Sequence, residues 1–185
     1  MVAPSSGRPK LFIAVELPVD LRRKLGGLVD RFRGTRGVRW VVPENYHLTL
    51  RFLGPTATAD IPRLAEVLAA LASRSAASVA EVTGFGSFPG GERTARVLLA
   101  RVQETGGSLT AWAAGIERVI PGVAGPFTPH VTLGRCDPAR TAPEGWTATR
   151  VRGGTFAVTG WTLYRSRIGG GPATYEALEV FPFRA

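Results

Sequence analysis

The sequence predicts an α+β fold of two similar lobes, in which two antiparallel sheets face a central cleft and helices cover the outer faces. Three observations predict this fold. Short apolar runs typical of buried strands alternate with segments of helical periodicity. The same order of elements occurs twice along the 185 residues. The pattern His-x-Thr-Leu occurs once in each half, at residues 47–50 and 130–133.

The first half contains four predicted strands and two predicted helices. The first strand, LFIAVEL, is an apolar run that ends at Pro18. The first helix has Asp20 as its expected N-cap, and its apolar residues recur at helical spacing until Gly34. The strands are residues 11–17, 38–42, 46–53 and 78–88, and the helices are residues 21–33 and 60–73.

The second half repeats this order with one helix. Ser108 is the expected N-cap of that helix, and a loop rich in glycine and proline, residues 121–129, follows it. Three glycines, residues 169–171, predict a turn between the last two strands and lack the Lys-Ser/Thr ending of a phosphate loop. The strands are residues 95–102, 130–135, 155–166 and 175–181, and the helix is residues 108–119.

Composition excludes several classes of protein. Hydrophobic residues make up 44% of the chain and charged residues 20%, which is typical of a globular domain. No apolar run is long enough to span a membrane. The single cysteine, Cys136, excludes an internal disulfide and favours the cytoplasm. We expect a flexible leader over residues 1–9, a single domain over residues 10–185, and a monomer.

The net charge of +9 has two interpretations. Arginine accounts for 21 of the 23 basic residues, and its planar guanidinium fits phosphate oxygens. Arginine in place of lysine also results from a GC-rich genome, and the arginines form no cluster along the chain. The charge is therefore compatible with a nucleic-acid ligand but does not identify one.

Both His-x-Thr elements are predicted to present their polar side chains on one face of a strand. Residues two apart in a strand point the same way, so His47 and Thr49 share a face, as do His130 and Thr132. The intervening apolar residues point into the core of each lobe. If the two lobes face each other, two imidazoles and two hydroxyls meet in one cleft.

This set of groups suits phosphoryl transfer without a metal. One neutral imidazole can accept a proton from the nucleophile, and one imidazolium can donate a proton to the leaving oxygen. Threonine hydroxyls can donate hydrogen bonds to the charged phosphate oxygens. A single histidine in an apolar strand is more often structural. The catalytic interpretation depends on the fact that the only two histidines of the chain both occur in this motif. Because there are only two histidines, no multi-histidine metal site is possible.

The chain resembles the two-histidine phosphoesterase superfamily, and within it the RNA 2′,3′-cyclic phosphodiesterases, historically named 2′-5′ RNA ligases. The resemblance covers nearly the whole chain from about Lys10. It is carried by these segments: FIAVELP at residues 12–18, ENYHLTLRFLG at residues 44–54, PHVTLGR at residues 129–135, LYRS at residues 163–166, and the strand of residues 175–181.

The resemblance implies a metal-independent hydrolysis of RNA 2′,3′-cyclic phosphate ends to 2′-phosphates, without a cofactor. By motif position, His47 would be the general acid on the leaving 3′ oxygen, and His130 the general base for water. Thr49 and Thr132 would hold the phosphate. In reverse, the same site would join a 2′,3′-cyclic end to a 5′-hydroxyl through a 2′-5′ linkage. The approximate symmetry leaves the acid and base roles interchangeable on sequence alone.

Four further residues are candidates for substrate binding. The family places a phosphate- or base-contacting arginine at Arg135 and an aromatic residue at Phe52. Strict alternation would point both away from the histidines, unless the strands bulge beside the glycines that lie near each. Alternation instead places Arg51 on the face of His47 and Thr49. Tyr46 could stack on a base or belong to the core.

Two alternative functions stay open. The first is a two-histidine enzyme that acts on small nucleotides such as ADP-ribose cyclic phosphate. The second is a nucleotide-binding module without catalysis, which the intact pair of motifs disfavours because binding alone does not require both imidazoles.

Overall fold

The computed structural model describes residues 8–90, 93–104, 106–120, 126–167 and 173–184. The predicted leader falls mostly outside these ranges, as do the glycine turn at residues 169–171 and most of the predicted loop at residues 121–129. The described helices are α1 (Val19–Asp30), α2 (Ile61–Ala72) and α3 (Ser108–Val119), with two short 3-10 helices, η1 (Pro43–Asn45) and η2 (Thr58–Asp60).

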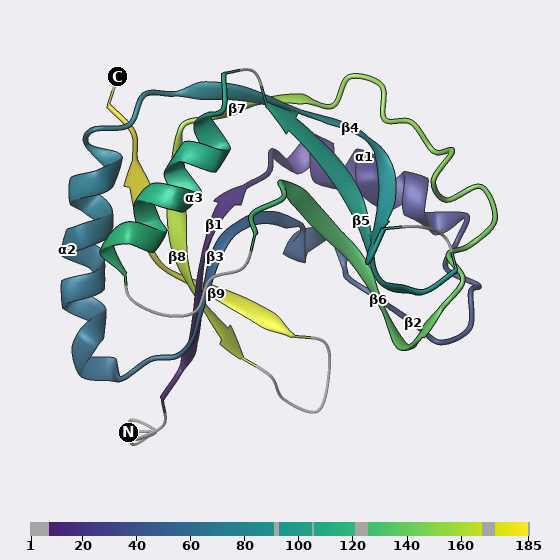
Figure 1. Ribbon diagram of the computed structural model, residues 1–185, viewed down its shortest axis with the longest axis horizontal. Coiled ribbons are helices and arrows are strands. Elements are labelled where there is room, and N and C mark those ends of the chain that lie inside the picture. Colours follow the sequence, from purple (N-terminus) through teal and green to yellow (C-terminus); the bar gives the residue numbers. More distant parts are fainter. Residues whose placement is uncertain (1–7, 91–92, 105, 121–125, 168–172, 185) are drawn as a thin grey trace.

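Nine strands of the described chain form one strongly curled antiparallel sheet (Figure 1). Their order is β7-β4-β5-β6-β3-β1-β8-β9, and β2 pairs with β6 outside this path. The strands are β1 (Lys10–Glu16), β2 (Val38–Trp40), β3 (His47–Pro55), β4 (Ser78–Phe88), β5 (Ala95–Glu104), β6 (His130–Arg140), β7 (Thr155–Val158), β8 (Gly160–Arg167) and β9 (Thr174–Pro182).

The sheet consists of two halves, one of five strands (β7, β4, β5, β6 and β2) and one of four (β3, β1, β8 and β9), that meet at a single pair of residues. Leu48 of β3 pairs with Val131 of β6, and no other register pair joins these two strands in the described chain. On either side of this pair, β3 continues alongside β1, and β6 continues alongside β5. The predicted α+β class and antiparallel strands are confirmed. The two predicted sheets are joined into one, which curls around the junction.

The helices cover the outer faces of the two halves. Helices α2 and α3 pack on one half, where α2 contacts β8 and β9 and α3 contacts β3 (Figure 1). The chain just after α1 lies on the other half, where Phe32 meets Trp146 edge to face and Trp146 packs against Phe85 of β4. One cluster of buried apolar side chains extends through both halves.

The structure differs from the predicted elements in three places. Helix α1 begins at Val19 with Pro18 at its N-cap position, so the expected N-cap Asp20 lies in the first turn of the helix instead. Residues 155–166 were expected as one strand, but β7 pairs with β4 in one half and β8 pairs with β1 in the other. The break falls at Thr159, just before Gly160, at which a Cβ atom would lie 2.5 Å from the carbonyl oxygen of Phe181. At the start of α3, Gly107 rather than Ser108 holds the N-cap position. The carboxylate of Glu104 accepts hydrogen bonds from the first backbone amides of this helix instead.

Candidate active site

Two neighbouring antiparallel strands bring the His-x-Thr elements together. His47 and Thr49 lie on either side of Leu48 in β3, and His130 and Thr132 lie on either side of Val131 in β6. Because Leu48 pairs with Val131, the two elements are related by an approximate two-fold axis through that pair. Both intervening residues are fully buried, so alternation turns the polar side chains to the opposite face, as predicted.

Both imidazoles are held by the same local hydrogen bond. His47 donates from Nδ1 to the carbonyl oxygen of Asn45, and His130 donates from Nδ1 to that of Thr128, each over 2.7 Å. A carbonyl oxygen only accepts, so the proton of each neutral ring is on Nδ1. Nε2 of each ring is then left with its lone pair, which is the state a general base needs.

The two histidines differ in their surroundings. Around His47 the ring centroid of Phe12 lies 4.9 Å away and that of Tyr175 lies 5.1 Å away, edge to face. Burial lowers the pKa of His47 to about 4, and the positive charges of His130 and Arg135 add smaller effects in the same direction. The pKa of His130, which meets Phe88 edge to face, is also lowered, mainly by burial.

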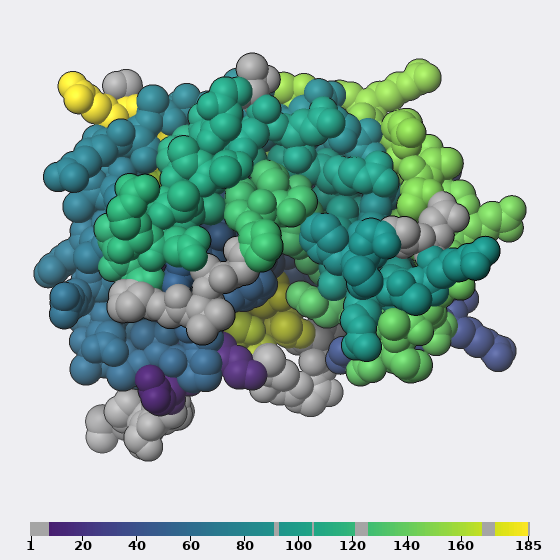
Figure 2. All heavy atoms as spheres, viewed as in Figure 1, coloured from purple at the N-terminus to yellow at the C-terminus, as the bar shows by residue number. Residues whose placement is uncertain are grey.

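A cavity of about 190 Å³ lies beside His47. We call it the His47 cavity. Its wall includes both threonines of the motifs, Thr49 and Thr132, together with Arg135 and Phe52. Their hydroxyls and guanidinium are the hydrogen-bond donors that a phosphate group would need. Figure 2 shows this side of the molecule hollowed near its centre, between teal and green atoms of the second half and the yellow atoms of β9.

His130 lines an adjoining groove of about 270 Å³, which we call the His130 groove. Thr49 and Phe52 contribute to both spaces, so the groove and the His47 cavity meet at these two side chains. The two imidazoles therefore line two neighbouring spaces, one in each, that have Thr49 and Phe52 in common. This arrangement suits a proton donor and a proton acceptor acting from two sides of one phosphate.

Matching β-bulges decide which later residues reach the site. In the pairing of β3 with β1, the paired residue that follows Thr49 is Arg51, so Leu50 is left unpaired. Opposite β5, the register moves from Thr132 to Gly134 in the same way. Each bulge adds one residue and reverses the alternation that follows it. As a result, Phe52 and Arg135 line the His47 cavity despite their odd offset from the histidines.

The same bulge overturns the alternation argument for Arg51, so the prediction that it shares a face with His47 and Thr49 is wrong. Arg51 pairs with buried Ile13 and is itself only 8% exposed. It lines the His130 groove and is absent from the lining of the His47 cavity. Tyr46 is also in the core at 1% exposure, and burial raises its pKa to about 12, so it does not reach a substrate in this structure.

Three residues of the site were not singled out from the sequence. Asn45 supplies the carbonyl that holds His47, and its side-chain amide donates a 2.6 Å hydrogen bond to the carbonyl of Ala173. Phe12 and Tyr175 form the aromatic surroundings of His47. Alternation in β1 could have indicated Phe12, because it lies between buried Leu11 and Ile13 and points to the other face.

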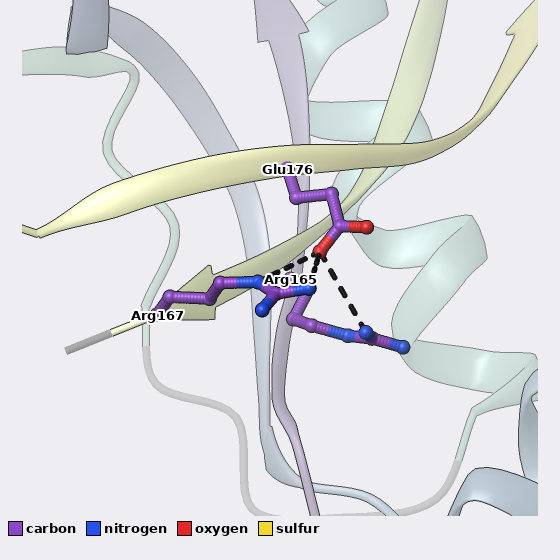
Figure 3. Close-up of polar contacts among 3 residues, drawn as sticks. All are labelled: Arg165, Arg167 and Glu176. Atoms are coloured by element: carbon purple, nitrogen blue, oxygen red, sulfur yellow. Dashed lines mark hydrogen bonds and ion pairs between the residues drawn. The ribbon is translucent and has the colours of Figure 1, made fainter. Parts of the chain in front are cut away.

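The hairpin that carries Tyr175 is held by charged groups next to it. Glu176 on β9 accepts two hydrogen bonds from Arg167 on β8, at 2.7 and 2.9 Å, and pairs with Arg165 at 3.6 Å (Figure 3). Successive residues of a strand point to opposite faces, so this cluster lies on the face away from Tyr175. It ties β8 to β9 and thereby helps to keep Tyr175 beside His47.

Two features are absent from the part of the chain that the structure describes. Across the described ranges, no three His, Cys, Asp or Glu side chains gather closely enough to hold a metal ion. In the same ranges, no helix combines the length and apolar character that a membrane span requires.

Comparison with known proteins gives the same family throughout. Residues 15–99 match the model of the LigT like Phosphoesterase family. An RNA 2′,3′-cyclic phosphodiesterase of Thermus thermophilus is 34% identical over 95% of this chain and 90% of its own length. A protein of the same name from Geobacillus stearothermophilus is 30% identical, and this chain spans 57% of its length.

Solved structures share the fold. The crystal structure of TT0787 of Thermus thermophilus superposes with a TM-score of 0.78 at 34% identity, covering 95% of this chain and 98% of that one. That of E. coli LigT complexed with 3′-AMP superposes with a TM-score of 0.76 at 25% identity, covering 96% and 99%. On its fold, its motifs and its identity to these relatives over nearly its whole length, the chain belongs to the LigT-like phosphoesterase family.

Proposed function

We propose that this chain is an RNA 2′,3′-cyclic phosphodiesterase that works without a metal or cofactor and yields a 2′-phosphate. One observation carries the proposal: two histidines, each with Nδ1 bonded to a backbone carbonyl and the lone pair left on Nε2, lie on neighbouring strands and line two spaces that share Thr49. Curated relatives that cover most of the chain have this activity in their names. We also propose that the protein acts as a monomer in the cytoplasm, since its single thiol forms no internal disulfide.

The reaction requires an acid and a base on opposite sides of the phosphorus. His130 takes a proton at Nε2 from the attacking water, and the oxygen of that water bonds to phosphorus. The P–O3′ bond breaks, and His47 gives the proton on its Nε2 to the departing 3′ oxygen. Bound phosphate favours protonation of His47, because its negative charge offsets the burial that lowers the pKa of this ring.

The residues of the His47 cavity bind the remaining groups of the substrate. Thr49, Thr132 and Arg135 donate hydrogen bonds to the phosphate oxygens, on which negative charge increases in the transition state. Phe52, with 64% of its surface exposed, offers its ring to the terminal base. The terminal nucleoside then occupies the His47 cavity, on the side of the leaving oxygen.

Product analysis tests the function. The substrate is an oligonucleotide with a 2′,3′-cyclic phosphate end, incubated with EDTA. We expect full activity and a 2′-phosphate product. A 3′-phosphate product would contradict the leaving-group assignment, and loss of activity in EDTA would contradict the metal-free mechanism. His47→Ala and His130→Ala should each lose about 10²–10⁴-fold in kcat.

Two threonine variants and one control test whether activity requires the hydroxyls of the His47 cavity in particular. Thr49→Val and Thr132→Val remove a hydroxyl from the His47 cavity, whereas Thr155→Val removes one from an exposed position of β7. We expect only the first two to lower kcat/KM. Comparing an oligonucleotide with mononucleotide and ADP-ribose cyclic phosphates tests the RNA assignment, because equal kcat/KM values would favour a small-nucleotide enzyme.

A further inference from the structure

A row of polar side chains across three strands lines one part of the His47 cavity. Lys10 at the start of β1 pairs with Ser166 of β8, and Ser166 pairs with Tyr175 of β9. Residues directly opposite each other in an antiparallel pair have their side chains on the same face of the sheet. All three residues line the His47 cavity. We call them the Lys10 row.

The Lys10 row lies about one nucleotide away from the threonines that would hold the cyclic phosphate. Phe12 is two residues after Lys10 in β1, and its ring contacts His47, so alternation turns Lys10 to the same side. Thr49 pairs with Ala14, which is four positions after Lys10 and thus about 13 Å away along the strand. The long, flexible side chain of a lysine and one nucleotide together span this distance.

The His47 cavity contains positive charge without a carboxylate. Lys10 and Arg135 line it, and none of its described lining residues is an aspartate or a glutamate. No ion pair joins Lys10 to an acidic side chain among the residues that the structure describes. The nearby Glu176 of β9 is bound by Arg165 and Arg167 instead (Figure 3). The ammonium group of Lys10 is therefore available to an anion that enters the cavity.

The proposed function indicates which anion this is. The cyclic phosphate is bound by Thr49, Thr132 and Arg135, and the terminal nucleoside occupies the His47 cavity. In an RNA chain the next phosphate is joined to the 5′ carbon of that nucleoside, on the other side of the ribose. An ammonium group and a hydroxyl group supply hydrogen-bond donors for its oxygens. The Lys10 row lies where this second phosphate is expected.

We propose that Lys10 and Ser166 bind the phosphate on the 5′ side of the terminal nucleoside. The inference rests on the proposed function, because it places that nucleoside in the His47 cavity. It adds a subsite that distinguishes the terminal nucleotide of an RNA chain from a nucleotide without this second phosphate. The pairing of β1 with β8 forms the subsite before a substrate binds.

Two dinucleotides test this subsite. Both end in a 2′,3′-cyclic phosphate, and they differ only in the internucleotide linkage, which is a phosphodiester in one and an uncharged methylphosphonate in the other. We expect kcat/KM of the wild type to be about fivefold or more higher for the phosphodiester, as for one partly exposed charge-assisted hydrogen bond. Because Lys10 is exposed, added salt should lower this ratio.

Variants of the only two lysines of the chain locate the effect. In Lys10→Met the ratio of the two kcat/KM values should fall to nearly one, whereas Lys10→Arg should keep most of it. Ser166→Ala should lower the ratio to a smaller extent. Lys24→Met removes the same charge from α1, where Nζ donates to the backbone carbonyls of Arg152 and Gly153, and should keep the wild-type ratio. This control measures the general attraction of the charged substrate by the net charge of +9.

The outcomes separate this inference from the proposed function. If the wild type hydrolyses neither cyclic end, the proposed function is wrong. If it hydrolyses both equally well, the subsite is wrong while the proposed function stands. A ratio that persists in folded Lys10→Met, or that falls as far in Lys24→Met, would overturn the assignment to Lys10. The comparison in the wild type decides whether the subsite exists even if Lys10→Met does not fold.

Discussion

His47 and His130 are oriented identically by the backbone: each donates Nδ1–H over 2.7 Å to the carbonyl oxygen of the residue two positions before it. The shared hydrogen bond leaves Nε2 of both rings available for proton transfer. The surroundings then make the two rings unequal, because aromatic rings enclose His47 more completely.

The pH dependence should reflect the lowered pKa of both histidines. The free enzyme needs one imidazolium, and with the pKa of His47 about 4 and that of His130 below its usual value, little of either ring is protonated at pH 7. We therefore expect kcat/KM to fall about tenfold per pH unit above pH 6.5, the usual histidine pKa. The profile of kcat should lie at higher pH, because bound phosphate raises both pKa values. A maximum of kcat/KM above pH 7 would contradict the effect of burial.

Replacement of the 3′ oxygen of the cyclic phosphate by sulfur should separate the acid from the base. A thiolate leaves without protonation, because its pKa is far below that of an alcohol. His47→Ala should therefore lose much less activity on the sulfur substrate than on the oxygen substrate, while His130→Ala should lose the same on both. If the sulfur substrate instead restored the activity of His130→Ala and not that of His47→Ala, the acid and base roles of the two histidines would be exchanged. The measurement is single-turnover hydrolysis of both substrates by each variant.

Phe52→Ala should weaken substrate binding without affecting stability. Its ring is 64% exposed at the junction of the two binding spaces, and one base–aromatic stack contributes about 1–3 kcal/mol. We expect KM to rise about fivefold or more while Tm changes little. Val180→Ala, on a similarly exposed residue of β9, is the control and should change neither quantity. An unchanged KM in Phe52→Ala would exclude base stacking at this position.

The close packing of β2 on β6 depends on a glycine. A Cβ atom at Gly134 would lie 2.9 Å from Trp40 and 3.0 Å from Val38 of β2, whereas at Gly115 in α3 it would meet open space. Gly134→Ala should lower both the free energy of unfolding and kcat/KM, because β2 must move away from β6. Gly115→Ala should raise the free energy of unfolding by up to about 1 kcal/mol through helix propensity. Urea denaturation of both variants measures the contrast.

Two buried tryptophans allow one hydrogen bond to be measured. Trp146 donates from Nε1 to the carbonyl of Gly86 over 2.7 Å, whereas Nε1 of Trp161 has no partner in the described chain. Both side chains are almost fully buried. Trp146→Phe should therefore cost about 1–3 kcal/mol more than Trp161→Phe, because it leaves a buried carbonyl unsatisfied. Equal losses in urea denaturation would mean that the hydrogen bond contributes nothing beyond packing.

The repeated His-x-Thr-Leu motif allowed much of the fold and the centre of the site to be predicted. The alternation of side chains along a strand is a local property. It therefore correctly predicted that four polar side chains point away from the buried residues between them: His47, Thr49, His130 and Thr132. The repeat also predicted an approximate two-fold relationship, which the pairing of Leu48 with Val131 confirms.

Alternation failed where strand pairing departs from a regular ladder. The bulges at Leu50 and Leu133 arise from pairing with β1 and β5, which are distant in sequence, and they redirect every residue after them. For the same reason, local patterns could not predict where the side chain of Arg51 lies, or that residues 155–166 are divided between the two halves of the sheet.

The sequence by itself determined which residues we propose for the chemistry, because residue type and local alternation can be read directly from the chain. Only the tertiary structure decided which of those residues line the His47 cavity and which line the His130 groove. At the junction of the two half-sheets the two imidazoles line neighbouring spaces that share Thr49, and the packing of Phe12 and Tyr175 around His47 makes its environment less favourable to charge than that of a solvated ring. Such differences come from neighbours that are remote in sequence, since burial and charge depend on everything within a few ångströms.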